Sequence, residues 1–72
     1  MADEKMRELA KAIKVLRAEK GFTQEKLAKK SGVSVCAIAL IENCKKKARV
    51  GTVVKLASAF EVEYETLLKY VM

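Results

Sequence analysis

The sequence predicts an all-α domain of five short helices, and three observations indicate this fold class. Apolar residues recur at three- and four-residue steps over most of the 72 residues, which is the spacing of one helix face. No segment alternates apolar and polar residues as a half-buried strand does, and the chain has no proline. Gly21 and Gly32 fall between the periodic segments, where glycine commonly ends a helix. A chain this short forms a single domain, residues 1–72.

The first helix is expected from about Asp3 or Glu4 to Lys20. Its inward face is defined by residues at helical spacing, namely Met6, Leu9, Ala10, Ile13, Leu16 and Arg17. Gly21 then ends the helix. Residues 1–5 precede this apolar stripe, and we expect them to fray.

Two short helices joined by a tight turn follow, at about 24–30 and 34–43. Thr23 and Ser34 stand at N-cap positions, where a side-chain oxygen accepts a hydrogen bond from a free backbone amide of the first helical turn. Gly32 lies between them, where the reversing chain needs a positive φ. A helix, a glycine-containing turn and a second helix are the sequence signature of a helix-turn-helix.

The remainder of the chain predicts a basic loop and two more helices. Residues 45–49 contain no apolar residue larger than alanine. A helix from Val50 to Phe60 follows, with inward positions at Val53, Leu56, Ala57 and Phe60. A last helix is expected from Tyr64 to Tyr70.

The net charge of +6 is unevenly distributed along the chain. Residues 22–50 carry seven basic and two acidic side chains, a net charge of +5, whereas residues 51–72 carry −1. A local basic surplus suits a polyanion such as DNA, and solubility is the alternative reading of the total charge.

Several chemistries lack their usual residues. The chain has no histidine, which is the common metal ligand, proton shuttle and triad base. It also has no phosphate-binding glycine loop and no paired carboxylates in a cleft-like context, so we expect no enzyme, no metal site and no cofactor. Cys36 and Cys44 lie about 12 Å apart on one helix, too far for a disulfide. Free cysteines without a signal peptide indicate the cytoplasm, and no apolar run reaches the roughly 20 residues of a membrane span.

The helix at 34–43 has two contrasting faces when its residues are placed at 100° steps. The inward face holds Ser34, Ala37, Ile38 and Ile41, with Glu42 at its edge. The outward face holds Val35, Cys36, Ala39, Leu40 and Asn43. Apolar outward side chains contact the thymine methyl but form no hydrogen bonds with guanine or cytosine. Three interpretations stay open: DNA binding through methyl and phosphate contacts, burial against a protein partner or second copy, and an exposed surface without a partner.

A series of residues between Ile13 and Leu68 stands at characteristic spacings. These are Leu16-Arg17, Thr23-Gln24, Leu27-Ala28, Gly32-Val33-Ser34, Ile38, Ile41-Glu42-Asn43, Lys45–Lys47, Thr52, Leu56-Ala57 and Val62. In this order they resemble the Xre/Cro-type helix-turn-helix family of phage and bacterial repressors. The resemblance implies a five-helix, lambda-repressor-like bundle.

The resemblance also implies residue roles. Gln24 would contact a phosphate, the outward residues of 34–43 would face the bases, and Asn43 with Lys45–Lys47 would hold flanking phosphates. The complete set assigned to DNA is Gln24, Ser34, Val35, Cys36, Ala39, Leu40, Asn43, Lys45, Lys46, Lys47 and Arg49. Arg17 and Glu42 match the family's ion pair between the first and third helices, with two solvated charges as the alternative.

Two positions depart from the family pattern. Cys44 replaces the common glycine, so either a left-handed helix end is strained or the helix runs on. Ala48 stands where the family often has proline, so we expect a more mobile loop.

We therefore expect a sequence-specific, DNA-binding transcriptional regulator. It would bind double-stranded DNA as a homodimer, with the helix at 34–43 in the major groove of an AT-leaning half-site. The candidate dimer surface is the C-terminal helix, with Tyr64, Leu67, Tyr70, Val71 and Met72, and core packing is the alternative for these residues. The alternative function is a protein-interaction module that uses the apolar outward face for a partner.

Overall fold

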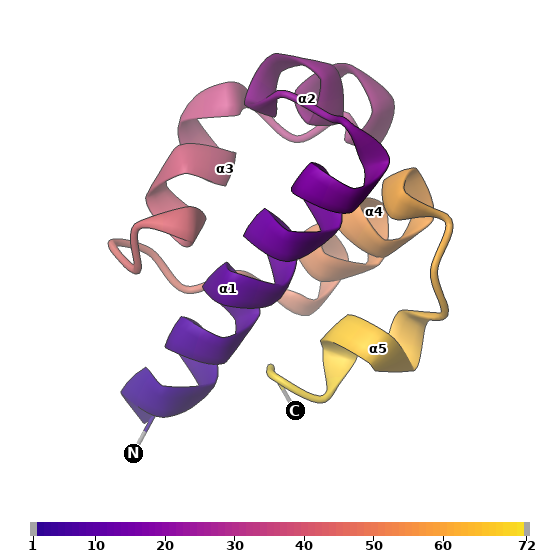
Figure 1. Ribbon diagram of the computed structural model, residues 1–72. Coiled ribbons are helices and arrows are strands. Elements are labelled where there is room, and N and C mark those ends of the chain that lie inside the picture. The colour runs from indigo at the N-terminus through magenta and orange to yellow at the C-terminus, as the bar shows by residue number, and fades with distance from the viewer. Residues whose placement is uncertain (1, 72) are drawn as a thin grey trace.

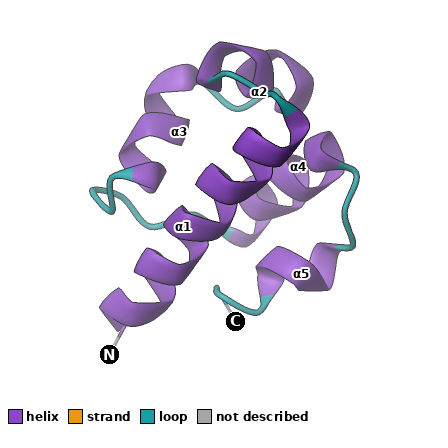
Figure 2. Ribbon diagram, viewed as in Figure 1, coloured by secondary structure: helices purple, strands orange, loops and turns teal. Residues whose placement is uncertain are grey.

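The computed structural model describes residues 2–71, which form five helices and no strand. The helices are α1 (Ala2–Lys20), α2 (Gln24–Ser31), α3 (Val35–Glu42), α4 (Val50–Phe60) and α5 (Tyr64–Leu68). The predicted all-α architecture is therefore confirmed. In Figure 1, α1 crosses the front of the molecule, with α2 and α3 at one end and α5 near the other. Figure 2 shows that only short connections separate the helices.

Helix boundaries differ from the predicted ones by one or two residues. The first helix begins at Ala2, and the expected fraying of residues 1–5 stays a prediction, with Met1 outside the described residues. The third helix is shorter than expected because Ser34 and Asn43 cap it and are not part of it. The fifth ends at Leu68, and turns replace the helix predicted to reach Tyr70.

Side-chain caps set where α2 and α3 begin. The Thr23 hydroxyl accepts a hydrogen bond from the Lys26 amide at 3.0 Å, and the Ser34 hydroxyl accepts one from the Ala37 amide at 3.1 Å. Gly32 adopts φ 76°, and its amide donates to the Ala28 carbonyl at 2.9 Å. The glycine takes this left-handed conformation without a Cβ clash, which lets α3 leave α2 after three residues.

A single apolar core joins all five helices. Its buried hydrophobic side chains include Leu9, Ile13, Leu27, Ile38, Ile41, Val53, Leu56, Phe60 and Leu67. Phe60 is the largest, and its ring stacks on the half-buried Phe22 ring with centroids 6.0 Å apart. The α4 helix packs against α1, α2 and α5, which places its inward face at the centre of the bundle.

The position of Leu67 corrects one expectation about the last helix. Leu67 was assigned to a candidate dimer surface, but its side chain is buried in the core. Tyr64 is 50% exposed, whereas Tyr70 and Val71 are half-buried and pack against the core. Met72 lies outside the described residues. The short α5 therefore contributes Leu67 to the core and leaves Tyr64 exposed.

Three helices end with the same pair of backbone hydrogen bonds. At the end of α3, the Lys45 amide donates to the Leu40 carbonyl at 2.8 Å and the Cys44 amide to the Ile41 carbonyl at 3.1 Å. This pattern is a Schellman motif, and it recurs around Gly21 after α1 and Glu61 after α4. Cys44 and Glu61 take the left-handed conformation at φ 57° and 58° although neither is glycine. The first alternative for Cys44, a strained helix end, is the one observed.

Replacing Cys44 with glycine should stabilise the fold. A left-handed residue with a Cβ costs about 1–2 kcal/mol, and glycine adds about 0.5–1 kcal/mol of chain entropy to the unfolded state. We therefore expect Cys44→Gly to raise the free energy of unfolding by about 0.5–1 kcal/mol in urea denaturation, with an unchanged m-value. The neighbouring Lys45→Gly, where φ is not positive, is the matched control and should give no gain. An equal or lower stability for Cys44→Gly would contradict the strain.

Candidate nucleic-acid interface

The α3 helix turns one side to the core and the other to solvent. Ile38 and Ile41 are buried, so this side of the helix packs on the core. Cys36, Leu40 and Asn43 are exposed on the opposite side, and Leu40 retains 37% of its accessible surface. Two of the residues expected on this outward face, Val35 and Ala39, are half-buried. The exposed outward face is therefore narrower than predicted and centres on Cys36 and Leu40.

Ser34 does not lie on the inward face of α3, where the helical wheel placed it. It is exposed, and it caps α3 from outside the helix. The capping role was predicted, but the wheel treated Ser34 as a helical residue, and the extended backbone of a cap breaks that periodicity. Its hydroxyl therefore lies at the solvent-exposed start of α3.

A buried carboxylate connects α3 to the two preceding helices. Glu42 is 3% exposed at its side chain, and Arg17 of α1 donates to it from Nε at 2.7 Å and from Nη2 at 3.1 Å. The Gln24 amide nitrogen, at the start of α2, donates to the same carboxylate at 2.9 Å. Arg17 Nη1 also donates to the Phe22 carbonyl at 3.0 Å. The structure thus brings Arg17 and Glu42 together and adds Gln24 to them.

The charge on Arg17 is secured by this environment. The hydrogen bond to Glu42 is the largest influence and raises the pKa of Arg17 above its ordinary value. Partial burial opposes this rise, and attraction to Glu42 and Glu25 adds further upward contributions. Because an arginine already titrates far above neutral pH, an upward shift keeps the guanidinium protonated at every pH where the protein is handled. The ion pair therefore does not switch with arginine protonation.

Gln24 has a role that sequence reasoning missed. It was expected to contact a phosphate, whereas here one amide hydrogen is used by Glu42, and the side chain is half-buried. An amide nitrogen has two hydrogens, so this bond does not use the second hydrogen or the carbonyl oxygen. No sequence signal connects Gln24 with Glu42, because the two residues are far apart in the chain and belong to different helices.

The connection between α3 and α4 is strongly basic. Its four cationic residues are exposed, and these are Lys45, Lys46, Lys47 and Arg49. Three of them help to line a hollow of about 340 Å³, together with Ala37, Ile41, Ala48 and Thr52. Thr52 belongs to the first turn of α4, where Arg49 makes no side-chain cap. The loop therefore places cations beside the open, electropositive start of a helix.

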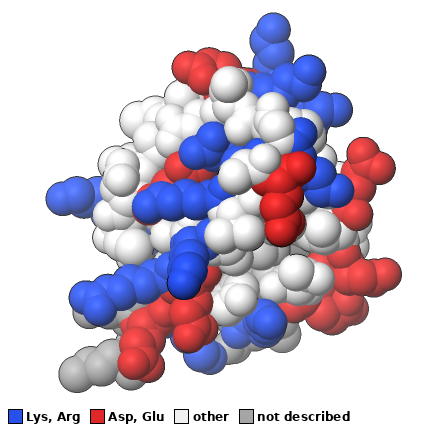
Figure 3. Space-filling view, in the orientation of Figure 1, with Lys and Arg blue, Asp and Glu red and all other residues white. Residues whose placement is uncertain are grey.

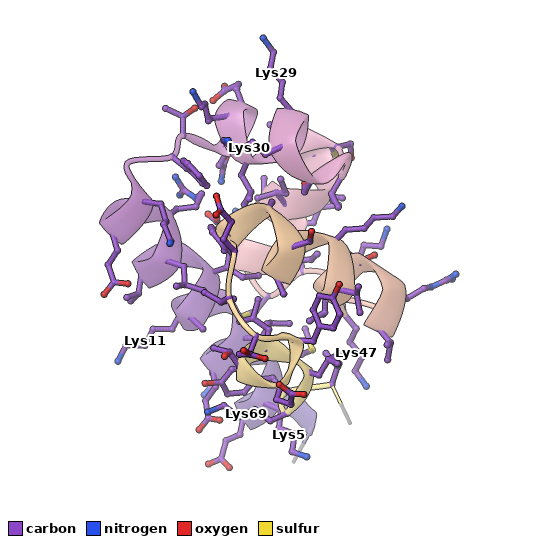
Figure 4. The ribbon with its side chains drawn as sticks, turned by 90° about the vertical axis from the view of Figure 1, so that its right-hand side faces the viewer. Lys5, Lys11, Lys29, Lys30, Lys47 and Lys69 are labelled. Atoms are coloured by element: carbon purple, nitrogen blue, oxygen red, sulfur yellow. The ribbon has the colours of Figure 1, made fainter. Side chains whose placement is uncertain are left out.

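The basic surplus predicted for residues 22–50 is divided between two places. Figure 4 shows Lys29 and Lys30 at one end of the molecule and Lys47 well away from them. The Lys30 ammonium lies 5.5 Å from the centroid of the Phe22 ring, which partly occupies it. In Figure 3, acidic side chains gather on the right-hand side, where the α4–α5 connection lies, whereas basic side chains project at the left, where the α3–α4 connection lies, and at the top over α2. The polarity of the surface therefore favours an anionic partner on the α3 side.

Other kinds of site find little support in residues 2–71. No group of three His, Cys, Asp or Glu side chains is positioned to hold a metal ion in this part of the chain. Cys36 and Cys44 are both free and exposed. Within the same range, no helix combines the length and apolar character that crossing a bilayer requires.

Comparison with known proteins agrees with this geometry. A family profile described as helix-turn-helix (HTH_3) matches residues 13–67. A crystal structure of an HTH_3 family transcriptional regulator from Vibrio cholerae superposes with a TM-score of 0.88 over 96% of this chain, at 23% sequence identity. The chain spans 39% of the length of that regulator, and likeness at this identity establishes the fold. No curated protein sequence matches the chain.

Removing Arg17 should destabilise the bundle because Glu42 would keep its burial and lose its charged partner. We expect Arg17→Ala to lower the free energy of unfolding by about 3 kcal/mol, measured by urea denaturation. Lys14→Ala, an exposed change on the same helix, should stay within about 0.5 kcal/mol of the parent.

A double variant separates the buried charge from the rest of the packing. Arg17→Met with Glu42→Leu removes both charges and should recover much of the loss. A loss within experimental error for Arg17→Ala would show that water or Gln24 compensates Glu42 alone.

Proposed function

Because the chain belongs to the Xre/Cro-like helix-turn-helix (HTH_3) family, we propose that it is a DNA-binding transcriptional regulator that inserts α3 into the major groove. The observation that carries this proposal is the placement of a solvent-exposed α3 face directly before an exposed basic loop. A helix of this kind fits the major groove, and the loop lysines then meet the phosphates that flank it.

Each group of residues takes a distinct part in this arrangement. The exposed Cys36 and Leu40, with the half-buried Val35 and Ala39 beside them, face the bases. The residues proposed to contact phosphates are Gln24, Ser34, Asn43, Lys45, Lys46, Lys47 and Arg49. Gln24 would contact a phosphate with the amide hydrogen that is not used by Glu42. Its hydrogen bond to Glu42 would then orient the side chain for this contact.

The eight residues of α3 reach few base pairs, which favours binding as a dimer. Two copies would read half-sites about one helical turn apart, and an apolar reading face favours A·T pairs with their thymine methyls. The proposed dimer surface is α5 with the facing part of α1. These helices, with the turn that follows α5, border an open groove lined by the apolar Val15 and Leu16, by Thr66 and Tyr70, and by charged side chains that include Lys11 and Lys69. Val15 is 46% exposed, an apolar residue that a second copy would cover.

The alternative function, a protein-interaction module, rests on one observation. Leu40 is one of few large hydrophobic side chains that remain exposed in residues 2–71, and it lies at the centre of the outward face of α3. A protein partner covering Leu40 would block entry of α3 into a groove. Failure to bind any duplex at low salt would favour this alternative over DNA binding.

The basic loop should determine affinity without determining sequence preference. In the double variant Lys45→Ala with Lys46→Ala, we expect weaker binding to all duplexes alike. The negative slope of log K against log salt should become shallower by about 2 for each copy bound, or about 4 for the dimer, because each lost phosphate contact removes about one released counterion. Fluorescence anisotropy at several salt concentrations measures both quantities.

Lys55→Ala supplies the control for this experiment. Lys55 is exposed on α4 and belongs neither to the residues assigned to phosphates nor to the proposed dimer groove, so its loss should leave the slope unchanged. An unchanged slope in the loop variant would contradict the assignment of these lysines to phosphates.

The dimer proposal predicts the mass of the protein in solution. Sedimentation equilibrium should give twice the 8.0 kDa of one chain at micromolar concentration. Val15→Lys should raise the dissociation constant at least about tenfold, because it would add a positive charge beside Lys11 and Lys69, which line the same groove. Val50→Lys is the matched control, since Val50 is 49% exposed at the start of α4, outside the groove. A parent protein that stays monomeric at all concentrations would rule out this dimer.

A further inference from the structure

The outward face of α3 carries side chains that suit one chemical group of DNA. We propose that this face reads the C5-methyl group of pyrimidines, so that 5-methylcytosine substitutes for thymine and binding responds to cytosine methylation. This inference rests on the proposed function, since it requires α3 to enter the major groove. It goes further by naming the ligand group and a covalent DNA mark that would control affinity.

The chemistry of the exposed face supports a methyl-reading surface. Between Ser34 at its start and Asn43 at its end, α3 exposes Cys36 and Leu40 and partly exposes Val35 and Ala39. None of these four side chains carries an amide, hydroxyl or charged group, and a thiol is a weak donor. The strong hydrogen-bonding groups thus lie at the two ends of the helix and are absent from the middle of its exposed face.

Base edges respond to such a surface in two ways. Guanine and unmodified cytosine present only donors and acceptors in the major groove, whereas thymine adds a C5-methyl group. Leu40 packed over a polar base edge would leave that edge dehydrated and without a partner, which is unfavourable. A methyl group at C5 instead gains an apolar contact, and 5-methylcytosine carries this methyl at the same ring position as thymine.

The spacing on α3 allows more than one methyl contact. Cys36 and Leu40 are four residues apart, so their Cβ atoms lie about 5–6 Å from each other on one side of the helix. Successive bases of one strand are separated by about 3.4 Å along the duplex axis. The two side chains therefore reach neighbouring or next-neighbouring base pairs, and each contributes its own contact.

The size of the effect follows from burial of one methyl group. Removing a buried methyl should weaken binding about three- to fivefold per contacted position. The same factor should appear for thymine against uracil and for 5-methylcytosine against cytosine, because each pair differs only by that methyl. Cytosine and thymine differ at a second atom, so 5-methylcytosine should recover part of the affinity of thymine and not all of it.

The test uses a duplex selected from random sequences by the purified full chain. At each thymine of the half-site, four versions are compared by anisotropy at one salt concentration: thymine, uracil, cytosine and 5-methylcytosine, each with its pairing base. We expect at least one position where uracil binds about three- to fivefold more weakly than thymine and 5-methylcytosine binds about three- to fivefold more tightly than cytosine.

A pair of variants connects the effect to α3. Leu40→Ala should bring the thymine-to-uracil ratio to about 1 at one position, and Leu40 is exposed enough that the fold tolerates the change, which a melting curve checks. Lys45→Ala is the matched control and should weaken both duplexes equally, leaving the ratio as in the parent.

The outcomes separate this inference from the function on which it rests. Salt-dependent duplex binding with uracil and thymine equal at every position would overturn methyl reading and leave the proposed function standing. A thymine preference without any effect of methylating cytosine would overturn the response to methylation. Absence of binding to every duplex at low salt would overturn both proposals.

Discussion

The buried carboxylate of Glu42 is the interaction on which the arrangement of the first three helices depends. Removing a charge from water is costly, and here three donor groups on two other helices compensate it. The apolar contacts of Ile38 and Ile41 hold α3 to the core but are not directional. Hydrogen bonds from Arg17 and Gln24 are directional, so they fix how far α3 is rotated and where α2 begins relative to it.

The helix ends impose the second constraint on the path of the chain. Each helix leaves carbonyl groups without partners at its end, and the ends of α1, α3 and α4 satisfy them with the same two-bond pattern. In α3 this pattern reverses the chain at Cys44 directly before the lysines, so the basic loop leaves in a defined direction. The strain at Cys44 and Glu61 indicates that tertiary packing, and not residue preference, sets these two ends.

Local signals predicted most of the fold. Thr23, Ser34 and Gly32 fixed the limits of α2 and α3 because caps and left-handed turns depend on neighbouring residues alone. The long-range features were less accessible. The bond between Gln24 and Glu42 joins distant residues whose types carry no pairing signature. The α5 helix spans too few turns for periodicity to separate the buried Leu67 from the exposed Tyr64. Charge counts along the chain could not reveal that Lys30 lies over Phe22.

The division of α3 between a buried and an exposed side has a consequence for how this protein can evolve. Ile38, Ile41 and Glu42 carry the stability of the helix, whereas Cys36, Leu40 and Asn43 contribute little to the core. Substitutions on the exposed side therefore alter the surface that the helix presents to solvent at little risk to folding. A lineage built on this bundle can exchange that surface residue by residue while the scaffold beneath it stays the same, and an engineer can do the same.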